Sequence, residues 1–459
     1  MKNGDQPILR LPSFQDQRGD AFLMVWGDLP YWTVVDGELR DLLRLLDGTR
    51  TLAEVTTSVA GRRQRKEARK AIELFASRGV VTSGEEVSAT PSANGAGRIE
   101  NIAINVTRRC NLRCRFCYNL DCLVASSEGE LSLADTIDVL EASRPFWGDT
   151  VALSILGGEP LLAEDKTLGL ITYAKRNGLV PIVSTNGTLV TPGSAKHAAK
   201  HGAEMQVSID GAFAETSDQV RGKGSFVRAV EGVKTLVAAG AHTILSMVCH
   251  QGNVAELEQF YELGLRLGVS EVRFIPLKRM GGADTSGFEP VPLGELITSA
   301  ISLFREHPEY KPLTGRDALS IIASTCQYAV GRASCGTGVQ TFLLDANGDV
   351  YPCLNTNVDS LRVANVGEAG FSFAKVWQES PVLQEVRRST AICSAKNACR
   401  KCEVRHWCLG GCRGETLATR GDLRLNAWDC DEQKQAVLEV MWALSETPDI
   451  VRRAQALEL

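Results

Sequence analysis

Three cysteines with the spacing of a metal-cluster motif lie in the run CNLRCRFC at residues 110–117. Cys110, Cys114 and Cys117 are separated by three and then by two residues. Four thiolates saturate a cubane iron–sulfur cluster, so three would leave one iron open to a small molecule. The alternatives are a zinc site or packing cysteines, but zinc ligands usually occur as closely spaced pairs. The pattern therefore favours an open, redox-active cluster.

A second group of cysteines lies in the last third of the chain. It comprises Cys335, Cys353, Cys399, Cys402, Cys408, Cys412 and Cys430. Seven thiolates are too many for one zinc ion and suit two iron–sulfur clusters, with a pair of zinc ribbons as the alternative. We interpret Cys122 as a free thiol and assign no role to Cys249.

The bulk composition agrees with a metal-binding protein of the reducing cytoplasm. The chain has 459 residues, 14 cysteines and a net charge of −5. Cytosolic thiols stay reduced, so clustered cysteines there indicate metal rather than disulfides. We expect no membrane span, because no apolar run reaches about 20 residues. We also expect no nucleic-acid partner, because the charge is not basic.

The elements that must position these cysteines follow from periodicity. Strand-like runs alternate with helical stretches six times between residues 99 and 278, at residues 99–106, 150–156, 179–185, 203–209, 242–248 and 270–276. Six β/α units in a row predict an α/β fold with a parallel sheet and helical crossovers. The first cysteine group follows the first strand, and the runs GGEP (157–160), TNG (185–187) and DG (210–211) follow or end the next three. Ligands bind at the carboxyl ends of such strands.

On these residues the chain resembles the radical S-adenosylmethionine (SAM) superfamily. Its signature is CxxxCxxC after the first strand of a partial (β/α)6 barrel, with an aromatic residue, here Phe116, before the last cysteine. The resemblance implies that SAM chelates the open iron of a [4Fe-4S] cluster. One electron then cleaves SAM to a 5′-deoxyadenosyl radical, which abstracts a hydrogen atom from the substrate.

The resemblance also implies the SAM contacts. Gly157, Gly158, Glu159 and Pro160 match the family's GGEP motif, whose backbone contacts the SAM amino group. The STNG run at residues 184–187 contains Asn186, and the SIDG run at residues 208–211 contains Ser208 and Asp210. Ser208 and Arg221 resemble the residues that hold the SAM carboxylate.

The second cysteine group resembles the SPASM domain of peptide-modifying radical SAM enzymes. The resemblance implies an outer auxiliary [4Fe-4S] cluster on Cys399, Cys402, Cys408 and Cys430, and an inner one on Cys335, Cys353 and Cys412, three clusters in all. Some members have a further cysteine where this chain has Thr341. The inner cluster therefore has an open iron, unless Cys326 or Cys393 closes it. Leu354 replaces the aspartate of the sulfatase-maturating enzymes, which argues against that role.

Residues from about 29 to 81 resemble the leader-peptide recognition domain of the pyrroloquinoline-quinone leader-binding family. That resemblance implies a small winged-helix-like fold that binds a precursor's leader by adding a strand to its sheet. The alternatives are a structural domain or, because the run at residues 62–70 is basic, DNA binding. Residues 84–98 are rich in Gly, Ser, Ala and Pro, so we expect a flexible linker and a domain that folds alone.

The predicted organisation is therefore a leader-binding domain (residues 1–83), a linker (84–98), a radical SAM partial barrel (99–280), a connecting region (281–334), a SPASM domain (335–430) and a C-terminal helix (431–459). The predicted function is a maturase that crosslinks a ribosomally synthesised peptide, with a thioether favoured over a carbon–carbon or carbon–oxygen bond. An electron donor such as flavodoxin or ferredoxin would reduce it. The rivals are a maturase of a protein side chain and, from another class, a winged-helix redox regulator.

Overall fold

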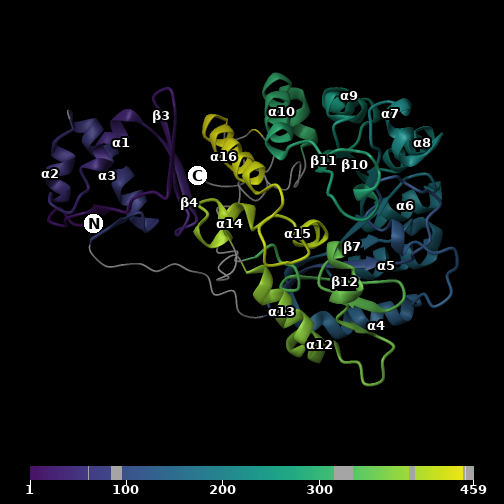
Figure 1. Ribbon diagram of the computed structural model, residues 1–459. Coiled ribbons are helices and arrows are strands. Elements are labelled where there is room, and N and C mark those ends of the chain that lie inside the picture. The colour runs from purple at the N-terminus through teal and green to yellow at the C-terminus, as the bar shows by residue number, and fades with distance from the viewer. Residues whose placement is uncertain (60, 84–95, 315–333, 392–397, 448–449, 451–459) are drawn as a thin grey trace.

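A computed structural model describes residues 1–59, 61–83, 96–314, 334–391, 398–447 and 450 (Figure 1). A sheet of nine strands forms its centre, in the order β11-β10-β9-β8-β7-β6-β12-β13-β14. Six parallel strands confirm the six predicted ones: β6 (Ile99–Asn105), β7 (Trp147–Leu156), β8 (Val180–Thr185), β9 (Glu204–Ser208), β10 (His242–Cys249) and β11 (Glu271–Pro276).

Helices connect these strands and cover one side of the sheet (Figure 1). They are α4 (Leu133–Ser143), α5 (Glu164–Arg176), α6 (Pro192–His201), α7 (Ala214–Arg221), α8 (Ser225–Ala238) and α9 (Leu257–Leu267). Local sequence sets their ends. Ser132 and Asp135 form a capping box at the start of α4, and Gly268, with φ of 71°, ends α9 in the left-handed conformation.

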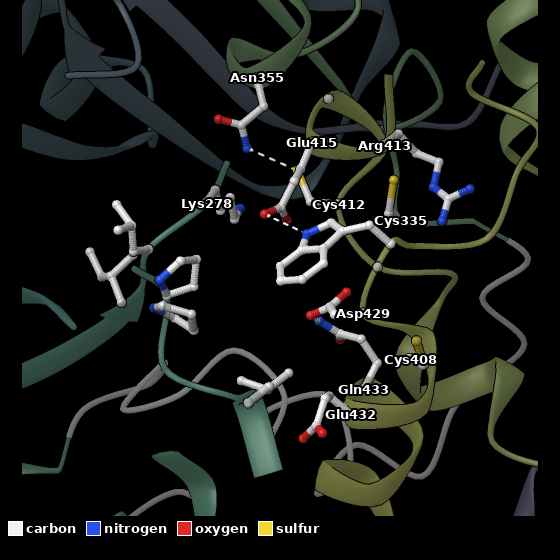
Figure 2. Close-up of a pocket in the computed structure, with 18 of the residues that line it drawn as sticks. Lys278, Cys335, Asn355, Cys408, Cys412, Arg413, Glu415, Asp429, Glu432 and Gln433 are labelled. Atoms are coloured by element: carbon white, nitrogen blue, oxygen red, sulfur yellow. Dashed lines mark hydrogen bonds between the residues drawn. The ribbon is translucent and has the colours of Figure 1, made fainter. Parts of the chain in front are cut away.

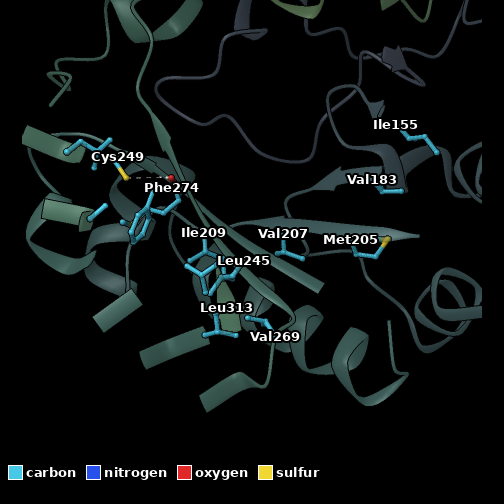
Figure 3. Close-up of a cluster of buried hydrophobic side chains, with 14 of the residues drawn as sticks. Ile155, Val183, Met205, Val207, Ile209, Leu245, Cys249, Val269, Phe274 and Leu313 are labelled. Atoms are coloured by element: carbon cyan, nitrogen blue, oxygen red, sulfur yellow. Dashed lines mark hydrogen bonds between the residues drawn. The ribbon is translucent and has the colours of Figure 1, made fainter. Parts of the chain in front are cut away.

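The barrel core lies between the sheet and these helices. Val207, Leu245 and Phe274 are among its buried side chains (Figure 3). Cys249 belongs to the same core and is 0% exposed, and burial raises the pKa of its thiol. Cys249 therefore acts as a small packing residue, which its isolated place in the sequence did not disclose.

The cysteine-rich part extends the barrel sheet beyond its first strand. β12 (Thr341–Leu344) pairs in parallel with β6, and β13 (Asp349–Tyr351) and β14 (Ala364–Asn365) continue the sheet antiparallel. Asp345, directly after β12, accepts hydrogen bonds from the side chains of Arg108 and Asn105. The remaining helices of this part are α12 (Phe373–Glu379), α13 (Pro381–Thr390), α14 (Arg405–Cys408), α15 (Arg413–Arg420) and α16 (Cys430–Glu446).

The connecting region contributes α10 (Leu293–Glu306), which packs against α16. α16 corresponds to the predicted C-terminal helix of residues 431–459, but it begins at Cys430 and ends at Glu446, so this cysteine lies on the helix itself. Residues 451–459 lie outside the described residues. In the part of the chain that the structure describes, no helix combines the length and apolarity that a membrane crossing requires.

The N-terminal unit combines a small antiparallel sheet with three helices. Its elements are β1 (Ile8–Leu9), β2 (Phe14–Arg18), β3 (Ala21–Trp26), β4 (Tyr31–Asp36), α1 (Gly37–Arg44), α2 (Leu52–Thr57), α3 (Arg62–Ser77) and β5 (Val81–Thr82). The strand order is β2-β3-β4, and β1 pairs separately with β5. Phe22, Met24 and Trp26 on one face of β3 pack into the unit's own core.

The other face of this sheet packs on the body of the protein. Leu23 and Val25 of β3 belong to the large core. β2 and α16 are joined by hydrogen bonds in both directions. Trp442 donates from Nε1 to Asp16 at 3.0 Å, and Arg18 pairs with Glu439 at 2.6 Å. The unit is therefore docked through an apolar sheet face, which the expectation of an independent domain did not include. Most of the predicted linker, residues 84–95, lies outside the described residues.

Gly27 tests this docking, because its α-carbon faces the backbone of Glu403. A Cβ at residue 27 would lie 2.7 Å from the Glu403 carbonyl oxygen. We expect Gly27→Ala to destabilise the protein by about 1–3 kcal/mol, the usual cost of overpacking, and to speed hydrogen exchange in α16. Urea unfolding and exchange measured by mass spectrometry provide the readouts.

Gly4→Ala is the matched control, since a Cβ there meets nothing within 4 Å. Equal effects of the two substitutions would show that the turn at Gly27 does not hold the domain in place.

Candidate active site

The first three cysteines lie on the loop after β6 and line one cavity of about 430 Å³. The loop folds back on itself, since the Cys117 amide donates to the Cys114 carbonyl at 3.1 Å. Gly282, in the 3-10 turn Gly281–Asp284, donates its amide to the Cys117 carbonyl at 2.9 Å. A Cβ at Gly281 would overlap the backbone of Tyr118, so the turn packs closely against this loop.

Burial and mutual charge set the state of these thiols. Burial raises the pKa of Cys110 and Cys114, and raises that of Cys117 to about 11. The neighbouring thiols raise the pKa of Cys117 further. The Arg221 guanidinium lowers the pKa of Cys114, because Arg221 Nη1 lies 4.0 Å from Cys114 Sγ. Three thiols that repel one another as thiolates fit a shared cationic centre, which would deprotonate them.

No three His, Cys, Asp or Glu side chains among the described residues stand close enough to hold a single metal ion. Ligands of an iron–sulfur cluster need no such closeness, because the cluster core lies between them. The donor chemistry of the three cysteines therefore fits the predicted cluster.

In the GGEP turn after β7, the backbone of the two glycines contacts the backbone of the cysteine loop directly. A Cβ at Gly157 would overlap the Thr107 carbonyl, and one at Gly158 would overlap that of Arg109. The Gly158 amide donates to the Thr107 carbonyl at 2.9 Å. Glycine is therefore required at both positions by close backbone approach.

Glu159 joins two loops of the site from behind the cavity wall. Its carboxylate is 0% exposed and accepts from the Thr185 hydroxyl at 2.7 Å and the Asn186 amide at 2.8 Å. Burial raises its pKa, and these hydrogen bonds lower it. Neither Glu159 nor Pro160 lines the cavity, so the structure places them as supports of the turn.

The SIDG run continues the same wall. Ser208 and Arg221 line the cavity together with Phe116 and Asn186, whereas Asp210 does not. Asp210 is 0% exposed and pairs with Arg221 at 2.6 Å. It thus orients the guanidinium that faces the cavity. The structure brings together all the residues predicted to contact SAM, with Glu159, Pro160 and Asp210 in supporting positions.

A second cavity of about 730 Å³ lies beside the first (Figure 2). Cys335, Cys353 and Cys412, the predicted inner set, all line it, and so does Cys408, which was predicted for the outer set. The two cavities share Asn355 and the segment Ile275–Lys278, which comprises the last two residues of β11 and the two that follow. Asn355 donates from Nδ2 to Cys412 Sγ at 3.5 Å.

Several charged side chains that the sequence analysis did not identify line this second cavity, among them Lys278 and Glu415. Lys278 has its pKa raised by the adjacent Cys412 thiol. Glu415 accepts from the Arg279 amide at 2.8 Å and from Trp428 Nε1 at 3.0 Å, and burial raises its pKa. The position of Lys278 at the carboxyl end of a predicted strand was a usable signal; Glu415, inside a helix, had none.

The predicted outer set also assembles. Burial, followed by the charges of Cys399, Cys402 and Cys430, raises the pKa of Cys408 to about 12. The four thiols therefore lie within electrostatic reach of one another, around α14 and the start of α16. Their mutual repulsion again fits a shared cationic centre.

The unassigned positions divide into two groups. Cys122 lies in a short 3-10 turn beside Asp345 and Arg108, and the cavity of the first three cysteines does not include it. Thr341 begins β12 and does not line the second cavity. Cys326 and Cys393, the candidate fourth ligands of the inner set, lie outside the described residues.

Comparison with known proteins gives the same assignment. Residues 104–264 match the family model of the radical SAM superfamily, and residues 335–403 match that of an iron–sulfur cluster-binding domain, SPASM. SAM and iron–sulfur clusters are therefore the cofactors of this chain.

Named relatives share most of their length with this chain. A mycofactocin maturase, MftC, of Mycobacterium ulcerans (strain Agy99) is 33% identical over 336 residues, which cover 68% of this chain and 83% of the relative. A PqqA peptide cyclase of Rhizobium meliloti is 27% identical, with coverages of 69% and 83%.

Among solved structures, Streptococcus suis SuiB bound to the precursor peptide SuiA has a TM-score of 0.56 at 15% identity, covering 93% of this chain and 98% of that one, a likeness of fold. With a curated relative above 30% identity over most of its length, the chain belongs to the radical SAM superfamily and, within it, to the SPASM-domain peptide maturases.

Proposed function

We propose that this enzyme installs a crosslink in a ribosomally synthesised precursor peptide. The observation that carries the proposal is the adjacency of two cavities, of about 430 and 730 Å³, that share the segment Ile275–Lys278. One is lined by the CxxxCxxC thiols and the other by the inner SPASM thiols. A peptide residue at the shared segment would have SAM on one side and an auxiliary cluster on the other.

Named side chains would hold the cofactors in this arrangement. Cys110, Cys114 and Cys117 would ligate the SAM-binding cluster, and Arg221, held by Asp210, would pair with the SAM carboxylate. When bound, SAM and its cluster supply the one-electron chemistry that removes a hydrogen atom from a substrate carbon. The protein contributes orientation and the exclusion of water, and Phe116 covers this cavity by packing against His250 and Phe288.

A thioether is the bond that we favour. The inner set offers Cys335, Cys353 and Cys412, and no fourth cysteine assigned to it lies among the described residues. A substrate cysteine could occupy the open position as a thiolate, since thiolates are preferred ligands of iron–sulfur clusters. Lys278, beside Cys412 at the boundary of both cavities, supplies a positive charge where that thiolate would enter.

A carbon–carbon or carbon–oxygen crosslink is the second candidate. Such a bond needs no thiol in the substrate, and the relative named PqqA peptide cyclase supports bond formation within a peptide without specifying the atoms joined. Modification of a protein side chain is a weaker alternative, because the chain belongs to the peptide maturases. The redox-regulator hypothesis is not retained, because this family is enzymatic.

The remaining parts of the proposal concern partners and cluster number. We propose three [4Fe-4S] clusters, a flavodoxin or ferredoxin as electron donor, a cytoplasmic location, and a leader peptide bound by the N-terminal sheet. The solved SuiB–SuiA complex supports the peptide partner through likeness of fold.

The β3–β4 turn adjoins the outer set through an ion pair between Asp28 and Arg405, 2.5 Å long. A leader bound to this docked sheet would start close to the auxiliary clusters.

Replacing Cys110, Cys114 and Cys117 together with Ala should abolish SAM cleavage, because the cluster that passes the electron to SAM loses its ligands. The auxiliary clusters should remain and keep the protein brown. Formation of 5′-deoxyadenosine under dithionite, with iron analysis, measures both effects. Cys122→Ala, on the same loop, is the matched control and should cleave SAM normally. Continued 5′-deoxyadenosine formation by the triple variant would refute the assignment.

Leader recognition predicts a substrate effect on the intact enzyme. A precursor peptide that this enzyme modifies should, once stripped of its leader, be modified at least about 10²-fold more slowly than the full precursor, because tethering raises local concentration. Mass spectrometry of the product measures the rates. Adding the separate leader should not restore the tethered rate but should compete with the full precursor. Equal turnover of both peptides would indicate a structural N-terminal domain.

The bond itself can be read from the product mass. A thioether crosslink makes the peptide lighter by two hydrogens and removes one cysteine from reaction with a thiol-alkylating reagent. A product lighter by two hydrogens whose cysteines all react would support the carbon–carbon or carbon–oxygen alternative. A control peptide with that cysteine replaced by serine should emerge without the crosslink.

A further inference from the structure

Arg413, the first residue of α15, carries a buried guanidinium that is only partly satisfied. The residue is 1% exposed, and Nη1 donates to the carbonyls of Leu423 at 3.1 Å and Leu425 at 2.8 Å. Nε and Nη2 are equally buried but have no acceptor among the residues that the structure describes. An unpaired buried cation is costly, so these two donors point to an anionic group that belongs beside them.

The surroundings identify which group this is. Nη2 lies against the turn between Cys408 and Cys412, since a Cβ at Gly410 would lie 2.5 Å from it. Arg413 lines the second cavity together with Cys408 and Cys412, but its guanidinium points away from Lys278 and Glu415 (Figure 2). The Arg413 guanidinium also lies within electrostatic reach of Cys399. The positive charge therefore acts on the outer set, consisting of Cys399, Cys402, Cys408 and Cys430.

We propose that Arg413 donates hydrogen bonds from Nε and Nη2 to the sulfur atoms of the outer auxiliary cluster and thereby raises its reduction potential. The proposal rests on the proposed function in that the outer set holds a cluster. Reduction adds one negative charge to a cluster, so a fixed cation with two directed donors stabilises the reduced form. Arg413 is thus a tuning residue, acting on the cluster rather than on the substrate.

Redox titration followed by electron paramagnetic resonance tests this in the Cys110, Cys114 and Cys117→Ala background, where the SAM-binding cluster is absent. The outer step is the one whose spectrum changes in Cys430→Ser. In Arg413→Met, at the potential that half-reduces the parent's outer cluster, the ratio of reduced to oxidised outer cluster should fall about tenfold. That corresponds to a midpoint about 59 mV lower for a one-electron couple. Arg413→Lys should give a smaller shift, because it keeps the charge but loses the planar fork.

Arg387→Met is the matched control. Arg387 is also buried, at 6% exposed, but its guanidinium donates to the carbonyls of Gly338 and Trp377. Its loss should leave the outer midpoint unchanged. An unshifted outer midpoint in a fully iron-loaded Arg413→Met protein, or a shift confined to the inner cluster, would overturn the proposal.

A second measurement covers the case in which Arg413→Met loses its cluster. Protein labelled with ¹⁵N-arginine should show a nitrogen hyperfine coupling at the reduced outer cluster, and this coupling should vanish in Arg413→Lys. Its absence from the labelled parent would also overturn the proposal. If instead the outer set holds no cluster, the parent protein itself would bind too little iron and would show no reduction step for an outer cluster.

Discussion

The parallel pairing of β12 with β6 is the contact on which the geometry of the whole site depends. The first cysteine loop leaves β6, and the hairpin of β12 and β13 leads directly to Cys353. Two cofactor regions more than 200 residues apart in sequence are therefore held on adjacent strands of one sheet. Asp345 locks the pairing, because its carboxylate binds Arg108 and Asn105 at the end of β6. A slip of this register would move the inner cysteines relative to SAM.

Close backbone packing brings the loops of the site near enough to share a cofactor. Gly157 and Gly158 let the β7 turn meet the cysteine loop directly, and Gly281 lets the turn after β11 do the same from the other side. In the cysteine-rich region, Gly414 likewise allows close backbone contact, since a Cβ at residue 414 would overlap the Asn355 carbonyl. Buried Glu159 then fixes the β8 loop by hydrogen bonds. These backbone contacts and hydrogen bonds hold the loops of the site against one another.

The sequence predicted the repeated and motif-bearing parts of this architecture well. Periodicity located all six barrel strands. The structure brings the cysteines of each predicted set near one another, while their division into an inner and an outer set stays a prediction. It could not predict contacts between distant segments. Nothing local to Leu23 or Val25 reveals that their strand face meets α16, because alternation looks the same whether the partner is near or far in sequence. The roles inferred for Lys278 and Arg413 depend on neighbours that are brought close only by folding.

The docked N-terminal sheet and the charges around the auxiliary sets address the same physical problem. Modification of a peptide requires that one of its residues reach SAM while electrons are delivered to the clusters and water is excluded from the site. Docking through Leu23 and Val25 places the sheet on the same body as the cavities, and Asp28 contacts Arg405, which also donates to the Cys402 carbonyl. Lys278 and Arg413 put one cation beside each auxiliary set. Because thiolate clusters are anionic, such cations would determine where an additional electron is stabilised, while the barrel would determine where the hydrogen atom is removed.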